Sequence, residues 1–272
     1  MYSIIRMSSN LSESQKSLYA EGKTLNQDSK HNDSTLKSVV DNELTEYANS
    51  LFRPLGFKIV IKDEMPTKEV YDMIVRHEPD FPYVDYTNDK TSMKPDGGIM
   101  FVVNDKGDRY PVLISEDKVQ GTNDSNKSQG LKRQSCGNAI ERGAKNLNFA
   151  KTLCNMFSYF PYVIFASGCD FHHSETISRR LEQMNGLMPN HYIDIGHKEF
   201  SVEEQLEKTL NDINIKKRFG NREYATVCIK SHKWDELPHG SSNWTREERI
   251  KIGKKVIQQS FEEIKKMYEL QA

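Results

Sequence analysis

Hydrophobic positions along the chain follow two spacings in turn, and this pattern predicts an alternation of strands and helices. Short runs of β-branched and aromatic residues, which are typical of strands, occur at 57–61, 98–103, 110–115, 162–166 and 224–229. Apolar residues at three- and four-residue spacing, which are typical of amphipathic helices, occur at 36–51, 66–77, 138–157, 202–213 and 245–270. Strands that alternate with helices favour a single α/β domain with a mixed sheet over residues 36–272.

The polar positions add expectations for the two ends of the chain. Residues 1–35 are rich in Ser, Asn, Lys and Asp and contain few apolar side chains, so we expect a flexible N-terminal arm. The segment 246–269 carries seven basic and five acidic residues, which we expect to form the solvated face of a helix.

Composition narrows the class of protein. The 272 residues include 38 basic and 39 acidic side chains, and a formal net charge of -1 excludes a uniformly basic coat but not a local basic face. No run of about 18 apolar residues occurs, so we expect no membrane-spanning helix. The cysteines are scattered and form no C-x-x-C pair, which fits a reduced, cytoplasmic protein rather than a disulfide scaffold or a zinc knuckle.

The strands 98–103 and 110–115 flank a turn at 104–108, so together they predict a β-hairpin. If the hairpin pairs symmetrically about the centre of this turn, Asp96 lies opposite Glu116. The two glycines that follow Asp96 would allow a backbone or a ligand to approach closely.

The hairpin also predicts a cluster of charged side chains at one strand end. Glu116 and Lys118 are two residues apart on one strand and therefore share the face of Asp96, whereas the Asp117 side chain points to the other face. Two facing carboxylates need a cation between them, and their oxygens, with the Asp117 backbone carbonyl in reach, suit Mg²⁺. An alternative stays open here, because most Glu-x-Lys pairs on strands are solvated surface groups.

A basic segment follows at 127–151, with six basic residues and one acidic residue. Such a segment can bind phosphates. Within it, Asn138 followed three residues later by Glu141 is typical of a capped helix start, and on the residues alone a capped helix with a solvated basic face is favoured. The alternative uses the same helix start to read DNA, with Asn138 paired to adenine, Glu141 accepting from an exocyclic amine and Arg142 donating to a purine.

Several short motifs carry a family resemblance. Pro95-Asp96 followed by Glu116-x-Lys118 matches the signature of the PD-(D/E)-x-K nucleases. In order and spacing, the segments 94–99, 116–121, 137–142 and 160–163 resemble those of the EcoRI family of restriction endonucleases. The resemblance implies a restriction-endonuclease-like mixed five-stranded sheet flanked by helices, which acts as a homodimer. It also implies that Asp96 and Glu116 hold Mg²⁺ and that Lys118 positions the attacking water.

The same resemblance implies residues that contact DNA. The Gly-Asn-Ala-x-Glu-Arg stretch at 137–142 corresponds to the family segment that reads an inner AATT. Gln120 matches a family position beside the catalytic lysine, and Arg180 corresponds to a family segment that reaches DNA. Lys145 is added because it belongs to the basic segment 127–151. The expected DNA-contacting residues are therefore Gln120, Asn138, Ala139, Glu141, Arg142, Lys145 and Arg180.

These implications together predict a type II restriction endonuclease that cuts both strands of a palindrome and leaves 5′-phosphate ends with a four-base 5′ overhang. GAATTC is the favoured site. RAATTY and CAATTG stay open, because the loop at 121–136 is shorter than in the family and Gln183 stands where the family has an arginine that would help to select guanine. A repair nuclease and an inactive DNA-binding homologue are the alternatives. A cognate DNA methyltransferase is expected in the same system, without direct contact.

Overall fold

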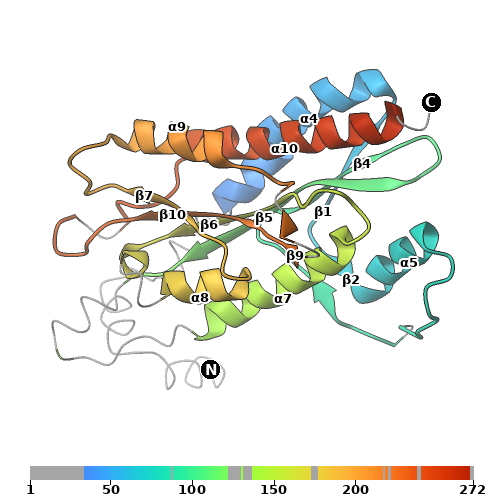
Figure 1. Ribbon diagram of the computed structural model, residues 1–272, viewed down its shortest axis with the longest axis horizontal. Helices are drawn as coiled ribbons and strands as arrows, with labels where there is room; N and C mark the ends of the chain where they lie inside the picture. The colour runs from blue at the N-terminus through green and yellow to red at the C-terminus, as the bar shows by residue number, and fades with distance from the viewer. Residues whose placement is uncertain are drawn as a thin grey trace, which may run out of the picture.

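A six-stranded mixed sheet forms the centre of the computed structural model (Figure 1). The structure describes residues 34–86, 88–121, 130, 137–172, 177–216, 218–219, 222–237 and 240–269. Across the sheet, the strands are β1 (Lys58–Lys62), β4 (Gly98–Val103), β5 (Arg109–Val119), β6 (Tyr162–Ser167), β10 (Thr226–Ser231) and β7 (His191–Asp194). The first three strands pair antiparallel, and the last four pair parallel. Two small ladders lie outside this sheet and pair β2 (Met65–Pro66) with β3 (Ser92–Met93), and β8 (Arg218–Phe219) with β9 (Arg222–Glu223).

The mixed α/β fold is confirmed, and all five predicted strands are present. Every residue of β6 and of β10 is buried, which fits the apolar run within each strand because helices cover both faces of the sheet. The sheet differs from the expectation by its sixth strand, β7. This strand pairs only with β10 at the sheet edge, and only Ile193 among its four residues is buried, so its sequence lacks the apolar run that marks the other strands.

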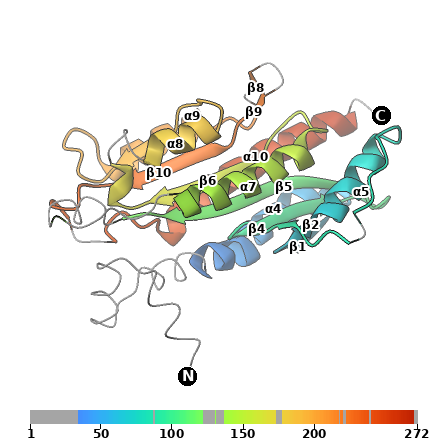
Figure 2. The same ribbon diagram turned by 90° about the horizontal axis from the view of Figure 1, so that it is seen from below.

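Helices cover both faces of the sheet (Figures 1 and 2). One layer contains α4 (Thr45–Phe52), α9 (Val202–Asp212) and α10 (Arg246–Glu269), and the other contains α5 (Thr67–His77), α7 (Gly137–Cys154) and α8 (Ile177–Met184). A π-helical turn (Val40–Leu44) continues into α4, and two short 3-10 helices are formed by Arg53–Leu55 and Cys169–Phe171. The predicted helices are thus confirmed to within a few residues at their ends. Within the described residues, no helix combines the length and apolarity that a membrane span requires.

The β4–β5 hairpin carries a β-bulge that changes its register. Near the turn, Val102 pairs with Tyr110 as symmetric pairing predicts, but beyond the bulge Gly98 pairs with Ser115, one residue out of that register. The bulge lies beside Pro111, which has no backbone N–H to give to the ladder, and such residues are tolerated at bulges. The symmetric register that places Asp96 opposite Glu116 is therefore wrong by one residue.

Candidate active site

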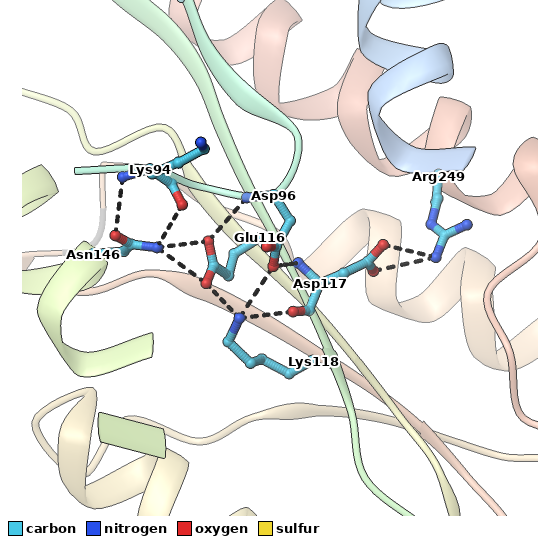
Figure 3. A network of polar contacts seen from close by, with 7 residues as sticks. All are labelled: Lys94, Asp96, Glu116, Asp117, Lys118, Asn146 and Arg249. Carbon is cyan, nitrogen blue, oxygen red and sulfur yellow. Dashed lines mark hydrogen bonds and ion pairs between the residues drawn. The ribbon is translucent and has the colours of Figure 1, made fainter. Parts of the chain in front are cut away.

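Asp96, Glu116 and Lys118 lie together where β5 approaches its carboxyl end (Figure 3). The Lys118 Nζ atom lies 3.1 Å from Asp96 Oδ2 and also contacts Glu116 Oε1. It donates a further hydrogen bond, 2.8 Å long, to the backbone carbonyl oxygen of Asp117. Two carboxylates and one carbonyl thus converge on a single ammonium group. The grouping of Asp96, Glu116 and Lys118 is as predicted, and their role as a metal site stays a prediction.

The bulged register brings the Asp96 carboxylate onto the backbone of β5. The Asp117 N–H donates to Asp96 Oδ2 at 3.1 Å, and the Asp96 N–H donates to Glu116 Oε2 at 3.2 Å. Gly97 makes this close approach possible, because a Cβ atom at that position would lie 2.1 Å from Ser115 Oγ and 2.9 Å from Leu36 Cγ. The cluster is therefore held by main-chain geometry as well as by side chains.

Asn146 of α7 is a fourth member of the cluster, and the sequence analysis missed it. Its Nδ2 atom lies 3.2 and 3.1 Å from the two carboxylate oxygens of Glu116 and 3.1 Å from the Lys94 carbonyl. The Lys94 N–H donates back to Asn146 Oδ1 at 3.2 Å. The signal that could have found it is its position, because Asn146 precedes the buried Ala150 by four residues and Leu153 by seven. A polar residue on the buried stripe of a helix needs a buried partner.

Burial sets the ionisation of the cluster. The Glu116 side chain is only 2% exposed, and this burial, with a smaller contribution from the charge of Asp96, raises the pKa of Glu116 to about 7 against the opposing effect of Lys118. Burial alone would lower the pKa of Lys118, but the two carboxylates outweigh it and raise that pKa, so the ammonium stays charged. Asp96, at 28% exposure, is the most accessible of the three side chains and forms the open side of the cluster.

The donor set of this cluster fits a hard divalent cation. All three groups that face Lys118 Nζ offer oxygen, from Asp96, Glu116 and the Asp117 carbonyl. No group of three or more His, Cys, Asp or Glu side chains with metal-binding geometry occurs in the described part of the chain. Mg²⁺ typically binds to one or two carboxylates and completes its shell with water and substrate phosphate oxygens, so two carboxylates and a carbonyl are sufficient protein ligands.

The segment expected to read bases, residues 137–142, is followed directly by a residue that lies beside this cluster, Gly143. Helix α7 starts at Gly137, one residue before the predicted start, and a Cβ atom on Gly143 would lie 3.3 Å from Lys118 Cε. The early turns of α7 therefore lie against the lysine side chain. The side chains of residues 137–142 lie outside the described residues, so the roles of Asn138, Ala139, Glu141 and Arg142 stay predictions, as does the N-cap. Most of the predicted arm, residues 1–33, also lies outside the described residues.

The remaining expected DNA contacts fall into two environments. Lys145 on α7 and Arg180 on α8 are exposed, as a residue that meets a phosphate must be. Gln120 is buried just beyond β5, where its N–H donates to the Ser167 carbonyl at 2.8 Å and its own carbonyl accepts from the Asp170 N–H at 3.3 Å. The structure thus brings Gln120 to the site end of β5 and leaves the roles of these three residues as predictions.

Comparison with known proteins identifies the family. A family model described as restriction endonuclease EcoRI matches residues 20–271. The chain belongs to the EcoRI restriction endonuclease family. This membership confirms the resemblance drawn from the short motifs.

Two members of the EcoRI family illustrate how far the similarity extends. The chain is 35% identical over 118 residues to the type II restriction enzyme EcoRI of Escherichia coli, across 40% of this chain and 42% of that protein. It is 29% identical over 148 residues to the type II restriction enzyme RsrI of Cereibacter sphaeroides, across 51% of this chain and 52% of that protein. The aligned region therefore spans about half, or less, of the length of each of these relatives.

Proposed function

We propose that this chain is a type II restriction endonuclease, which hydrolyses both strands of a short palindromic DNA site with Mg²⁺ as its cofactor. The observation that carries the proposal is the convergence of Asp96, Glu116 and the Asp117 carbonyl on the Lys118 ammonium. Membership in the EcoRI restriction endonuclease family supports it independently.

In this proposal each residue of the cluster has a separate role in hydrolysis. Asp96, Glu116 and the Asp117 carbonyl would hold Mg²⁺, which supplies positive charge to the scissile phosphate when it is bound. Lys118 would then donate hydrogen bonds to the attacking water and to a phosphate oxygen. Water would add to phosphorus in line while the bond from phosphorus to the 3′ oxygen breaks. The water would lose one proton to solvent and the 3′ oxygen would take up one proton from solvent, so the products would be a 5′-phosphate and a 3′-hydroxyl.

Asn146 would act as a positioning residue in the same centre. Its amide nitrogen donates to both oxygens of Glu116. The amide also forms two hydrogen bonds with the backbone of Lys94, two residues before Asp96. It therefore fixes the separation of the two carboxylates. Groups that orient metal ligands in this way commonly contribute about 10- to 100-fold to affinity or activity.

Base recognition would come from the start of α7. Asn138, Ala139, Glu141 and Arg142 would read the inner AATT. The position of Gly143, where an added Cβ atom would lie 3.3 Å from Lys118 Cε, supports a reading segment close to the scissile bond. Lys145 and Arg180 would contact the DNA backbone, and Gln120 would contact the site beside the catalytic lysine. A two-fold symmetric site implies a two-fold symmetric enzyme, so the active form would be a homodimer.

The favoured site is GAATTC, with cleavage before the first A and a four-base 5′ overhang. RAATTY and CAATTG are the alternatives for the outer pair, because Gln183 provides no bidentate contact to guanine, a contact worth about 1–3 kcal/mol.

Digestion of plasmid DNA with Mg²⁺, followed by sequencing of the fragment ends, tests the proposal. Discrete fragments whose ends carry AATT support it, and the flanking bases distinguish the three sites. A smear without defined ends would instead indicate a nuclease of another role, such as repair. Binding without any cutting would indicate an inactive DNA-binding homologue.

A further inference from the structure

A buried ion pair lies directly behind the proposed nuclease centre. Asp117 points away from Glu116 and Lys118, through the opposite face of β5, and meets Arg249 of α10 (Figure 3). The Arg249 Nη2 atom lies 3.0 and 3.2 Å from the two carboxylate oxygens of Asp117. The side chains are 1% and 2% exposed, so the charged residues of α10 do not all form the solvated face expected from the sequence.

A buried ion pair of this kind contributes little to the stability of a fold. Burying two charges carries a desolvation cost that their mutual attraction often fails to offset, and well-packed apolar replacements are often equally or more stable. Within the described part of the chain, Nε and Nη1 of Arg249 have no acceptor. Within the described residues, the hydrogen bonds of the buried guanidinium therefore go to the Asp117 carboxylate. An apolar contact between α10 and the sheet would join the two elements without the desolvation cost of this pair.

The Asp117–Arg249 pair anchors the backbone of β5, the strand that carries Glu116 and Lys118. The Asp117 N–H donates to Asp96 Oδ2, and the Asp117 carbonyl accepts from Lys118 Nζ. Both peptide groups that flank the Asp117 Cα thus face the cluster while its side chain is anchored on the other face. A movement of this one residue would displace an oxygen ligand and loosen both Asp96 and Lys118.

We infer that Arg249 is a positioning residue for DNA cleavage, which acts through Asp117 to set the main-chain carbonyl between Glu116 and Lys118. This inference rests on the proposed nuclease function. It adds α10 to the elements that shape the proposed centre, although this helix packs on the face of β5 opposite to Glu116 and Lys118.

A second buried ion pair on α10 provides a matched control. Lys230 of β10 lies 2.7 Å from both carboxylate oxygens of Glu248, the residue before Arg249, and its side chain is 5% exposed. The Lys230→Met and Arg249→Met substitutions each remove one buried cation and leave one buried carboxylate on or beside the same helix. Only Arg249→Met removes a contact to the catalytic strand.

The experiment compares both variants with wild type by single-turnover cleavage at saturating Mg²⁺, by DNA binding with Ca²⁺ and by Tm. We expect both to lower Tm, but only Arg249→Met to slow cleavage, by about 10²-fold with DNA affinity retained, since a misplacement of about 1 Å costs that much. Arg249→Lys, which keeps the charge, should recover part of the rate.

A double variant covers the case in which Arg249→Met fails to fold. Asp117→Leu with Arg249→Met replaces the ion pair by two apolar side chains, and we expect a Tm at or above the wild-type value with cleavage still slow. A wild-type rate in this double variant or in Arg249→Met would overturn the inference, as would an equal loss of rate in Lys230→Met. Absence of cleavage by the wild type would instead overturn the proposed function.

Discussion

Lys230 and Lys118 both lie on this sheet and contact carboxylates, and they differ in burial, in charge balance and in access. Lys230 meets one carboxylate, Glu248, with the Asn243 carbonyl as a further acceptor at 3.2 Å and the Trp244 ring centroid at 5.7 Å. Lys118 meets two carboxylates, of which Asp96 is 28% exposed. The first cluster is neutral and closed, whereas the second opens to solvent and holds one negative charge in excess when Glu116 is ionised, above about pH 7.

The difference separates a structural ion pair from the proposed cation site. A neutral, closed pair has no capacity for a further cation and fastens α10 to β10. An open pair of carboxylates with excess negative charge can exchange its lysine contacts for a divalent cation, because the cation supplies more charge to the same oxygens. The Lys230 cluster is therefore the reference against which the Lys118 cluster can be tested.

Metal removal should have the largest effect. EDTA should stop DNA cleavage completely, and Mg²⁺ in excess should restore it, because two carboxylates and one lysine alone provide too little positive charge at the phosphate. Ca²⁺ should support DNA binding without cutting, since its looser coordination holds the site without organising the water. Both effects are measured by plasmid digestion and by filter binding, and full activity in EDTA would refute the metal site.

Substitution of the cluster residues should come next in size. Asp96→Ala, Glu116→Ala and Lys118→Ala should each reduce cleavage by about 10³-fold or more, because each removes a ligand or a positioned charge, while Ca²⁺-supported DNA binding persists. Single-turnover rates measure the effect. The Lys230→Met variant is the control and should cut near the wild-type rate at a reduced Tm. A Lys118→Ala variant that cuts at the wild-type rate would show that the lysine belongs to an ordinary ion pair.

Asn146→Ala should produce an intermediate loss. Without its amide, both Glu116 oxygens lose a donor, so we expect cleavage to fall by about 10- to 100-fold and half-saturation to require more Mg²⁺. Titration of the cleavage rate with Mg²⁺ separates the two effects. If the variant keeps the wild-type Mg²⁺ dependence and only loses stability, Asn146 is a packing residue.

The smallest predicted effect is a pH dependence. Below about pH 7 Glu116 is protonated, so binding of a metal must displace that proton, and the apparent Mg²⁺ affinity should fall by about tenfold per pH unit below this value.

The stability of the metal-free protein should change with pH in the opposite direction to the Mg²⁺ affinity. Folding raises the pKa of Glu116 from 4.5 to about 7, so its contribution to stability is greatest below pH 4.5 and is lost as the pH rises to about 7. Glu116→Gln should flatten both profiles, and calorimetric Mg²⁺ titrations with unchanged pH dependence in that variant would reject this assignment.

The sequence predicted the parts of the fold and site that depend on local pattern. The strands and helices followed from hydrophobic spacing, and Asp96, Glu116 and Lys118 followed from strand periodicity and the short turn between β4 and β5. The register was missed by one residue because the bulge beside Pro111 depends on how the ladder accommodates an extra residue.

The supporting residues required tertiary structure. Asn146 lies 30 residues from Glu116 in the chain, and Arg249 lies 132 residues from Asp117. Each was hidden in a helix whose composition fits an ordinary surface element, and only the packing of α7 and α10 on opposite faces of β5 brings them to the site. Edge strand β7 was missed for a related reason, since it joins the sheet only through β10.

The proposed metal site can be located by anomalous scattering from Mn²⁺ in crystals of the wild-type protein, because Mn²⁺ accepts the same oxygen ligands as Mg²⁺. We expect a single strong peak per chain among the Asp96 carboxylate, the Glu116 carboxylate and the Asp117 carbonyl, with Lys118 Nζ displaced from its present position. We expect no peak at the Lys230 cluster. A peak elsewhere in the protein, with Lys118 still between the two carboxylates at saturating Mn²⁺, would show that this cluster is not the metal site.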